Sequence, residues 1–144
     1  MNIAHVLARK GGHVHTIRPE QTVREALAAL ARHNIGALVV VEQTDRPVGI
    51  ISERDIVRAL VEDEAMFARA VRDLMTRDVI VATPEDDLMS VAHTMTERRI
   101  RHLPVVVGGR LVGIVSIGDV VKAQRDQYEG EIATLQMQIT DMPS

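Results

Sequence analysis

The sequence predicts a mixed α+β (α/β) fold in which two β-α-β-β-α units pack face to face. Three observations support this prediction: an internal duplication, an apolar spacing typical of amphipathic helices, and runs of β-branched residues bounded by turns. The chain has 144 residues, of which 46% are hydrophobic and 26% charged, as is ordinary for a globular protein. With one Phe, one Tyr and no Trp, its core must be aliphatic.

The duplication is visible by direct alignment. Residues 18–41 fall on residues 83–106 at an offset of 65, with apolar residues coinciding at the i, i+3, i+4, i+7 spacing of a helix with one buried face. The offset then becomes 64, where Gly-Ile-apolar-Ser-x-x-Asp occurs as Gly49–Asp55 and again as Gly113–Asp119. The second repeat is therefore one residue shorter between these two stretches, and the difference falls in a turn, where changes of length cost least. The chain is therefore a tandem repeat.

Each unit is expected to begin with a short extended segment and a helix. These are His15–Ile17 with Val23–His33, and Val79–Ala82 with Leu88–Arg98. Two β-branched strands follow, joined by the polar or Gly-rich turns of hairpins: Leu38–Val41 with Val48–Ser52, and Leu103–Val107 with Leu111–Ser116. The Ser-x-x-Asp then opens a second helix, over Glu53–Val61 in the first unit and from Ile117 onward in the second. One such unit cannot cover the apolar face of its own sheet, so two are needed.

These elements predict four segments along the chain. They are residues 1–64 for the first repeat, 65–73 for a charged helical connector, 74–126 for the second repeat and 127–144 for a C-terminal helical extension. The extension carries apolar residues at heptad steps: Tyr128, Ile132, Leu135, Ile139 and Met142. Two heptads are few for a self-sufficient coiled coil, and Gly130 weakens the helix by about 1 kcal/mol relative to Ala. We therefore expect the last helix to pack on a second subunit.

The doubled pattern resembles the CBS-domain pair, or Bateman module, of the small stand-alone bacterial type. The residues that carry the resemblance lie within His33–Leu60 and Val71–Ala123, and it extends over about residues 1–126. It implies a pseudo-two-fold disc with two clefts between the repeats. In the family, such clefts commonly hold adenosine-containing ligands such as AMP, ADP, ATP, NAD or S-adenosylmethionine. It also implies a homodimer.

The resemblance places Ser52 and Asp55, and likewise Ser116 and Asp119, on the ligand motif of the family. A strand that ends at serine brings a hydroxyl and the free N–H groups of a helix to one place, which favours phosphate oxygens. One turn further on, a carboxylate can accept hydrogen bonds from both ribose hydroxyls. The same residues can also form a capping box that only satisfies backbone donors. The sequence leaves both interpretations open.

A cationic neighbourhood in the second repeat favours the ligand interpretation. Arg101 and His102 match family positions that often contact ligand phosphate, whereas the first repeat has Gly36 and Ala37 there. The first repeat instead places Arg54 within its own Ser-x-x-Asp motif. We therefore expect the two clefts to be chemically unequal and to differ in affinity or in preferred phosphate length.

Other candidate residues are less specific. Ile17 and Ala82 lie on the extended segments that approach the cleft in family members, where they either contact adenine or pack in the core. His13 and His15 place two imidazoles on one face of an extended segment, but no nearby carboxylate or third histidine completes a metal site, and no metal is predicted. Lys10 lies in a Gly-containing turn from which it can lean toward a phosphate.

Together these features predict a regulatory module that binds an adenine nucleotide, with AMP favoured and ATP, ADP or NAD as alternatives. We expect it to act on an unidentified protein partner and not to be an enzyme, because no catalytic constellation can be argued from the spacing. The competing interpretations are a structural interaction protein with empty clefts and an enzyme with a cryptic activity.

Composition excludes several classes of protein. The formal net charge of −3 gives no reason to expect binding to nucleic acid or to an anionic membrane. No apolar run reaches the roughly 18–20 residues of a membrane span, and the first residues do not read as a secretory signal. With no cysteine there is no disulfide framework, and we expect a cytoplasmic protein.

Overall fold

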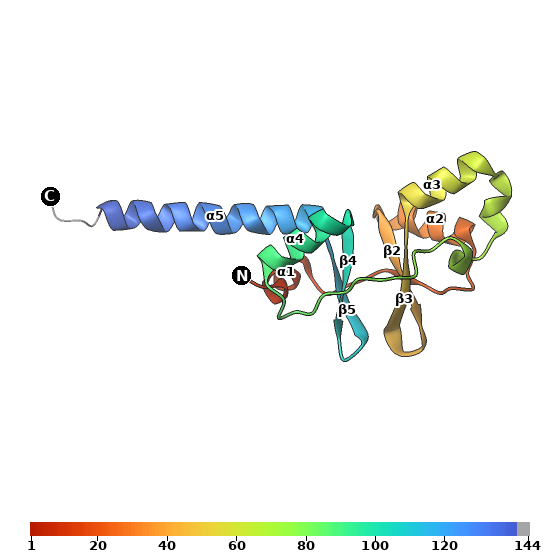
Figure 1. The fold of residues 1–144 in the computed structure, drawn as a ribbon, viewed down its shortest axis with the longest axis horizontal. Coiled ribbons are helices and arrows are strands. Elements are labelled where there is room, and N and C mark those ends of the chain that lie inside the picture. The colour runs from red at the N-terminus through yellow and green to blue at the C-terminus, as the bar shows by residue number, and fades with distance from the viewer. Residues whose placement is uncertain (141–144) are drawn as a thin grey trace.

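The computed structural model describes residues 1–140 and shows two similar α+β halves, as the duplication predicts (Figure 1). The first repeat has a three-stranded sheet in the order β1-β2-β3, composed of β1 (Thr16–Ile17), β2 (Ala37–Glu42) and β3 (Arg46–Ser52). β1 is parallel to β2, and β3 is antiparallel to β2.

The second repeat repeats this plan with one strand reduced to a single bridge. Its hairpin consists of β4 (His102–Val107) and β5 (Arg110–Ser116). Where β1 would have its counterpart, Ala82 makes an isolated parallel bridge to Val105. Both hairpins shift register at the equivalent step, Val40/Val41 in one and Val105/Val106 in the other, so the duplication extends to this irregularity.

The helices that follow from apolar periodicity have the predicted bounds. α2 (Val23–His33) and α4 (Leu88–Arg98) each bury one face, and each ends at a residue with left-handed φ, Asn34 and Arg99 respectively. α3 (Glu53–Glu62) and α5 (Ile117–Thr140) follow β3 and β5 directly. The connector between the repeats is helical, but it consists of two short 3-10 helices, η2 (Glu64–Ala68) and η3 (Val71–Asp73).

An N-terminal helix, α1 (Ile3–Lys10), is not among the elements predicted from the sequence. It begins with a capping box in which Asn2 Oδ1 accepts from the His5 N–H and His5 Nδ1 accepts from the Asn2 N–H, both at 3.2 Å. A cap residue followed by Ile3, Val6 and Leu7 is a short form of the helical spacing. That pattern is the signal that could have revealed the helix.

The two repeats exchange the segments that precede them. Ile3 and Val6 of α1 are buried in the core of the second repeat, whereas Val71 of η3 is buried in the core of the first. One isolated β-bridge connects each exchanged segment to the repeat on which it packs: Asn2 pairs with Asp87, and Ala70 pairs with Thr22. Residues 1–64 and 65–140 therefore do not form independent bodies, because each core contains apolar side chains from the other part of the chain.

Two equivalent glycines receive the exchanged segments. A Cβ atom on Gly113 of β5 would lie 2.6 Å from Leu7 Cδ2, and one on Gly49 of β3 would lie 2.5 Å from Met75 Sδ. The glycines thus leave space for Leu7 and Met75 to lie directly on the strands. This close approach gives a structural reason for the repeated glycine at the start of both motifs.

Two aliphatic cores result, one in each repeat. The first contains Ile17, Val23, Ala26, Leu30, Leu38, Val40, Ile51, Ile56 and Val71. The second contains Ile3, Val6, Ala82, Leu88, Val91, Met95, Leu103, Val105, Val115, Val120 and Ala123. They lie under α2 and α3 in one repeat and under α1, α4 and α5 in the other.

The C-terminal half of α5 projects beyond the second repeat (Figure 1). At about 1.5 Å per residue, its 24 residues extend over roughly 36 Å. Of the predicted heptad positions, Tyr128, Ile132, Leu135 and Ile139 are exposed, whereas Met142 lies outside the described residues. Among the helices within residues 1–140, none has the length and apolar character needed to cross a bilayer.

Filling the space at Gly113 tests the exchange. We expect Gly113→Ala to lower the free energy of unfolding by about 1–3 kcal/mol, because the added methyl overlaps Leu7. Combining it with Leu7→Ala relieves the overlap, so the double variant should lose less than the sum of the two single variants. Urea denaturation followed by circular dichroism measures these values.

Gly130→Ala is the matched control for this experiment. Nothing lies within 4 Å of a Cβ at Gly130, and the residue is inside α5, so the change should stabilise the helix by up to about 1 kcal/mol. Strict additivity of Gly113→Ala and Leu7→Ala would contradict the packing of α1 on β5.

Candidate functional site

The Ser-x-x-Asp motif of the second repeat lies where β5 ends and α5 begins. The Asp119 N–H donates to Ser116 Oγ at 3.1 Å, and the Ser116 N–H donates to Asp119 Oδ2 at 2.9 Å. This is the reciprocal pattern of a capping box. Both side chains are half-buried, and the hydrogen of the Ser116 hydroxyl is still available for donation.

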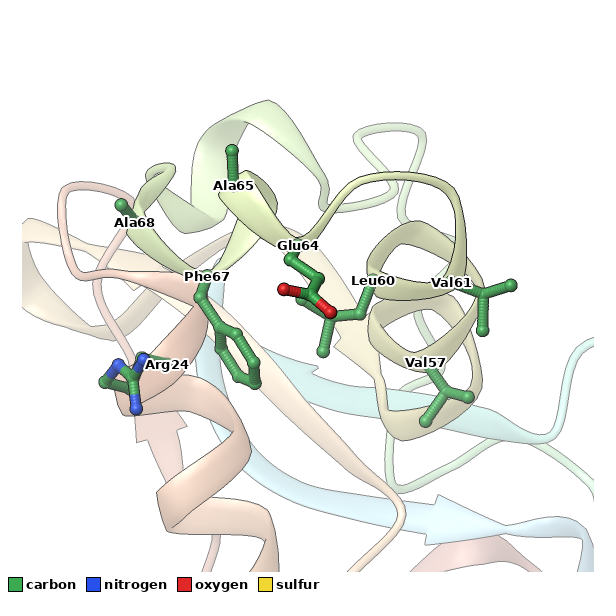
Figure 2. Close-up of a pocket in the computed structure, with 8 residues that line it drawn as sticks. All are labelled: Arg24, Val57, Leu60, Val61, Glu64, Ala65, Phe67 and Ala68. Carbon is green, nitrogen blue, oxygen red and sulfur yellow. The ribbon is translucent and has the colours of Figure 1, made fainter.

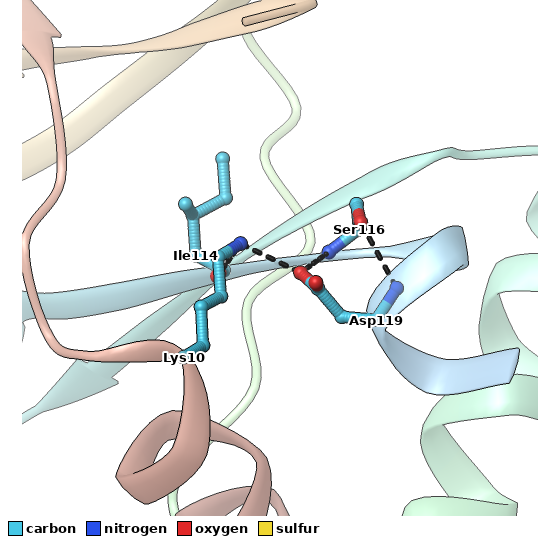
Figure 3. A network of polar contacts seen from close by, with 4 residues as sticks. All are labelled: Lys10, Ile114, Ser116 and Asp119. Atoms are coloured by element: carbon cyan, nitrogen blue, oxygen red, sulfur yellow. Dashed lines mark hydrogen bonds and ion pairs between the residues drawn. The ribbon is translucent and has the colours of Figure 1, made fainter. Parts of the chain in front are cut away.

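Lys10, at the end of α1, completes this site (Figure 3). Its Nζ donates to Asp119 Oδ2 at 2.6 Å and to the carbonyl oxygen of Ile114 at 2.9 Å. Partial burial alone would raise the pKa of Asp119, but the hydrogen bonds from Lys10 and Ser116 outweigh it and hold that pKa below its ordinary value. The carboxylate is therefore ionised at neutral pH and is paired with an ammonium group.

The first repeat has only half of this arrangement. The Asp55 N–H donates to Ser52 Oγ at 3.2 Å, which caps α3. Within residues 1–140, however, the Asp55 carboxylate accepts no hydrogen bond and makes no ion pair. Arg54 is exposed on the first turn of α3. The two motifs are thus chemically unequal within the described residues, because Lys10 and the Ser116 N–H bond to the carboxylate of one while the carboxylate of the other has no such partner.

A cavity of about 330 Å³ lies between the repeats. It is lined by Lys10, His13, Val14, His15, Ile35, Gly36, Ala37, His102, Ile114 and Ser116. Its volume is within the range of small-molecule sites. One part of the lining is apolar, and the rest carries one ammonium, three imidazoles and one hydroxyl. This lining suits a ligand with a flat apolar part and an anionic part.

His102 connects the two repeats at this cavity. A Cβ atom on Gly36 would lie 3.4 Å from the His102 ring, so the imidazole of the second repeat contacts the start of β2 in the first. Burial lowers the pKa of His102, and the charge of Lys10 lowers it further, against an opposing effect of Asp119. At neutral pH the ring is therefore neutral. Arg101, its neighbour in sequence, is exposed and does not line the cavity.

Ile17 and Ala82 lie in the hydrophobic cores of the two repeats. Their exposed fractions are 3% and 2%, and neither lines the cavity. Core packing, one of the two roles considered for them, is what these side chains do here. Within the described chain, the apolar contacts available to a ligand come from Val14, Ile35 and Ile114, which the sequence did not single out.

His13 and His15 acquire a third histidine in the structure. The ring of His33, from the end of α2, stacks on the ring of His15 with 3.6 Å between the ring centroids. The ring of His13 lies edge-on to that of His15, with 4.7 Å between the centroids. Stacked rings direct their in-plane nitrogen lone pairs alongside one another and not toward a common point. No group of metal-ligating side chains within residues 1–140 could hold a metal ion.

A second concave region, on the outer face of the first repeat, is larger and mainly apolar (Figure 2). This groove of about 680 Å³ is lined by Arg24, Val57, Leu60, Val61, Glu64, Ala65, Phe67 and Ala68. The Arg24 guanidinium lies 4.6 Å from the centroid of the Phe67 ring. The groove contains none of the sequence-predicted ligand residues.

Comparison with known proteins identifies the family. The CBS domain model matches residues 5–62 and again residues 71–126, so the chain belongs to the CBS domain family and contains two copies of the domain. It is 38% identical over 121 residues to the mitochondrial CBS domain-containing protein CBSX3 of Arabidopsis thaliana. That alignment covers 81% of this chain but 59% of the relative, so the chain spans less than two thirds of that protein.

Solved structures show the same fold. The CBS-domain protein ATU1752 of Agrobacterium tumefaciens superposes with a TM-score of 0.81 at 38% identity, covering 86% of this chain and 99% of that one. The CBS domain pair of protein MJ0100, in complex with 5'-methylthioadenosine and S-adenosyl-L-methionine, has a TM-score of 0.79 at 29% identity. It covers 88% of this chain and 98% of its own.

Asp119→Asn tests the ion pair of the second motif. We expect the free energy of unfolding at pH 7 to fall by about 1–2 kcal/mol, because Lys10 loses its partner in a half-exposed position. A lowered folded-state pKa stabilises the fold above the unfolded pKa of about 3.9 and ceases to do so as the pH falls through the folded value. The difference between wild type and variant should therefore begin to shrink near pH 4 and vanish only once the pH is below the folded-state pKa.

Asp55→Asn is the control, since that carboxylate has no partner within residues 1–140 and its replacement should change stability by less than about 0.5 kcal/mol. Urea titrations at pH 7 and pH 3.5 measure both variants. Equal losses at the two positions would show that Lys10 contributes nothing specific.

Proposed function

We propose that the chain is a regulatory module that binds an adenosine-containing nucleotide, AMP in the first place, in the cavity between its repeats. The observation that carries the proposal is the composition of that cavity. Lys10, His102 and Ser116 surround one side of it, whereas Gly36 and Ala37 of the first repeat form the other. A molecule bound there contacts both repeats at once.

The site offers a group for each part of a nucleotide. Asp119 does not itself line the cavity, but it is bonded to Lys10 and Ser116, which do. Its carboxylate can accept from the two ribose hydroxyls once Lys10 withdraws, and the Lys10 ammonium is then free for a phosphate oxygen. The Ser116 hydroxyl and the start of α5 also favour phosphate. Val14, Ile35 and Ile114 provide apolar contacts for the adenine ring. The adenosine moieties of the two ligands bound to the MJ0100 pair support this class of ligand.

The signal is proposed to pass through the interface between the repeats. A nucleotide that bridges them stiffens their mutual position and shifts the population of shapes that a protein partner recognises. The adenosine half is common to AMP, ADP, ATP and NAD, so Ser116 and Asp119 do not distinguish among them. We further propose that the chain has no enzymatic activity of its own, and a nucleotide recovered unchanged after incubation with the pure protein is the expected result.

Isothermal titration with AMP tests the binding proposal. We expect Asp119→Ala to weaken AMP binding by roughly 30- to 150-fold, corresponding to a loss of about 2–3 kcal/mol, with the fold intact by circular dichroism. Asp55→Ala is the matched control for the other motif, and it should leave AMP binding in this cavity unchanged, because Asp55 does not line it and makes no contact with Lys10. If Asp119→Ala binds AMP as tightly as the parent, the assignment of Asp119 is wrong.

We also propose a homodimer that forms through the projecting part of α5. Tyr128, Ile132, Leu135 and Ile139 follow one another at steps of four, three and four residues, with exposed fractions from 37% to 67%. An apolar stripe with this spacing on a projecting helix is the surface that a second copy of the same helix would cover.

Leu135→Glu tests the dimer by placing a charge in the centre of the stripe. We expect the dimer to dissociate at least tenfold more readily, as measured by analytical ultracentrifugation over a concentration series. Thr134→Glu adds the same charge one position away from the stripe and should leave the association unchanged. A wild-type protein that stays monomeric at high concentration would contradict the proposal.

A further inference from the structure

The cavity between the repeats has an unusual excess of imidazole groups at one side. His13 and His15 line it on the segment between α1 and β1, and His102 lines it from β4. His33 stands behind His15, with the two rings stacked at 3.6 Å. Four of the six histidines of the chain therefore lie at or next to this cavity.

Within residues 1–140 none of these four histidines has an anionic partner of its own. The one ion pair there that includes a histidine is His93–Glu97, on the exposed face of α4 and outside the cavity lining. No carboxylate of the described residues lines the cavity, and Asp119, which acts on His102, is already paired with Lys10. Protonation of the imidazoles would therefore gather positive charge that the protein compensates only in part.

We propose that His13 and His15 form a phosphate subsite of this cavity, and that a phosphorylated ligand takes up protons as it binds there. The inference rests on the proposed function, since it concerns the anionic end of the same ligand. It makes the affinity for the nucleotide depend on pH, while the affinity for the unphosphorylated nucleoside does not.

The direction of the pH dependence follows from the surroundings of the rings. Partial burial lowers the pKa of His15, and the nearby His33 and His13 lower it further. Burial lowers the pKa of His102, Lys10 and Arg101 lower it further, and Asp119 acts against them. In the free protein His15 and His102 are therefore mainly neutral near pH 7. A dianionic phosphate among them favours their charged form and raises the same pKa values.

Proton uptake couples the binding of the nucleotide to the protonation of the imidazoles. An imidazole whose pKa rises by about one unit on binding can strengthen binding by at most about tenfold as the pH falls through its titration range. Protonation of the phosphate itself, near pH 6, acts in the opposite direction because it removes ligand charge. Tighter binding at lower pH within the range 8 to 6.5 must then come from groups on the protein.

Calorimetric titration of the full chain with AMP and with adenosine tests the inference. Between pH 8 and pH 6.5 we expect the Kd for AMP to fall roughly five- to tenfold, while that for adenosine changes less than twofold. At pH 7, titrations in two buffers with different ionisation enthalpies should show net proton uptake with AMP and none with adenosine. This second measurement needs no variant.

His13→Gln together with His15→Gln should remove most of the pH dependence and of the proton uptake, because only His102 then remains among the imidazoles that line the cavity, and should leave adenosine binding unchanged. His93→Gln is the matched control, because it changes an exposed histidine outside the cavity, and it should behave as the parent does. If AMP binds with an affinity independent of pH and without proton uptake, the phosphate subsite is wrong while the proposed function stands. If neither AMP nor adenosine binds at any pH, both are wrong.

Discussion

The packing of each repeat against the segment that precedes the other is the interaction on which this structure depends. α1 lies on the second repeat through Ile3 and Val6, and η3 lies on the first repeat through Val71. Leu7 and Met75 lie against equivalent glycines of the two hairpins. Because each core takes apolar side chains from the other part of the chain, neither repeat can close its core alone. The cavity between the repeats consequently has walls whose positions are coupled to both cores.

Lys10 links this packing to the candidate site. It ends α1, so its position is set by the burial of the apolar face of α1, while its ammonium pairs with the Asp119 carboxylate, the proposed ribose acceptor. A ligand that engages Asp119 must replace a charge-assisted hydrogen bond and not merely displace water. In exchange, the released ammonium lies beside a cavity with three imidazoles, where an anionic group of the ligand can compensate it. The same residue therefore stabilises the unliganded chain and favours an anionic ligand.

Prediction from the sequence succeeded where the determining contacts are local in the chain. α2, α4 and both hairpins follow from apolar spacing and turns, and the serine–aspartate motifs lie at helix starts as their hydrogen-bonding groups require. The capping and ligand interpretations need not exclude each other, because Ser116 caps α5 and also lines the cavity. The sequence missed α1, which is short and gains its stability from packing on the second repeat. It also left Lys10 in a loop, 109 residues away from the carboxylate it pairs with.

The sequence by itself determined the duplication and the order of strands and helices within each repeat, because these are fixed by periodicity and by residue type at matched positions. Tertiary structure alone decided which histidines meet, that Ile17 and Ala82 pack inside the cores, and that Lys10 neutralises Asp119 while Asp55 has no such partner in the described chain. The reason is physical: these contacts join residues far apart in sequence, and they form only once the exchanged segments have brought the two repeats together.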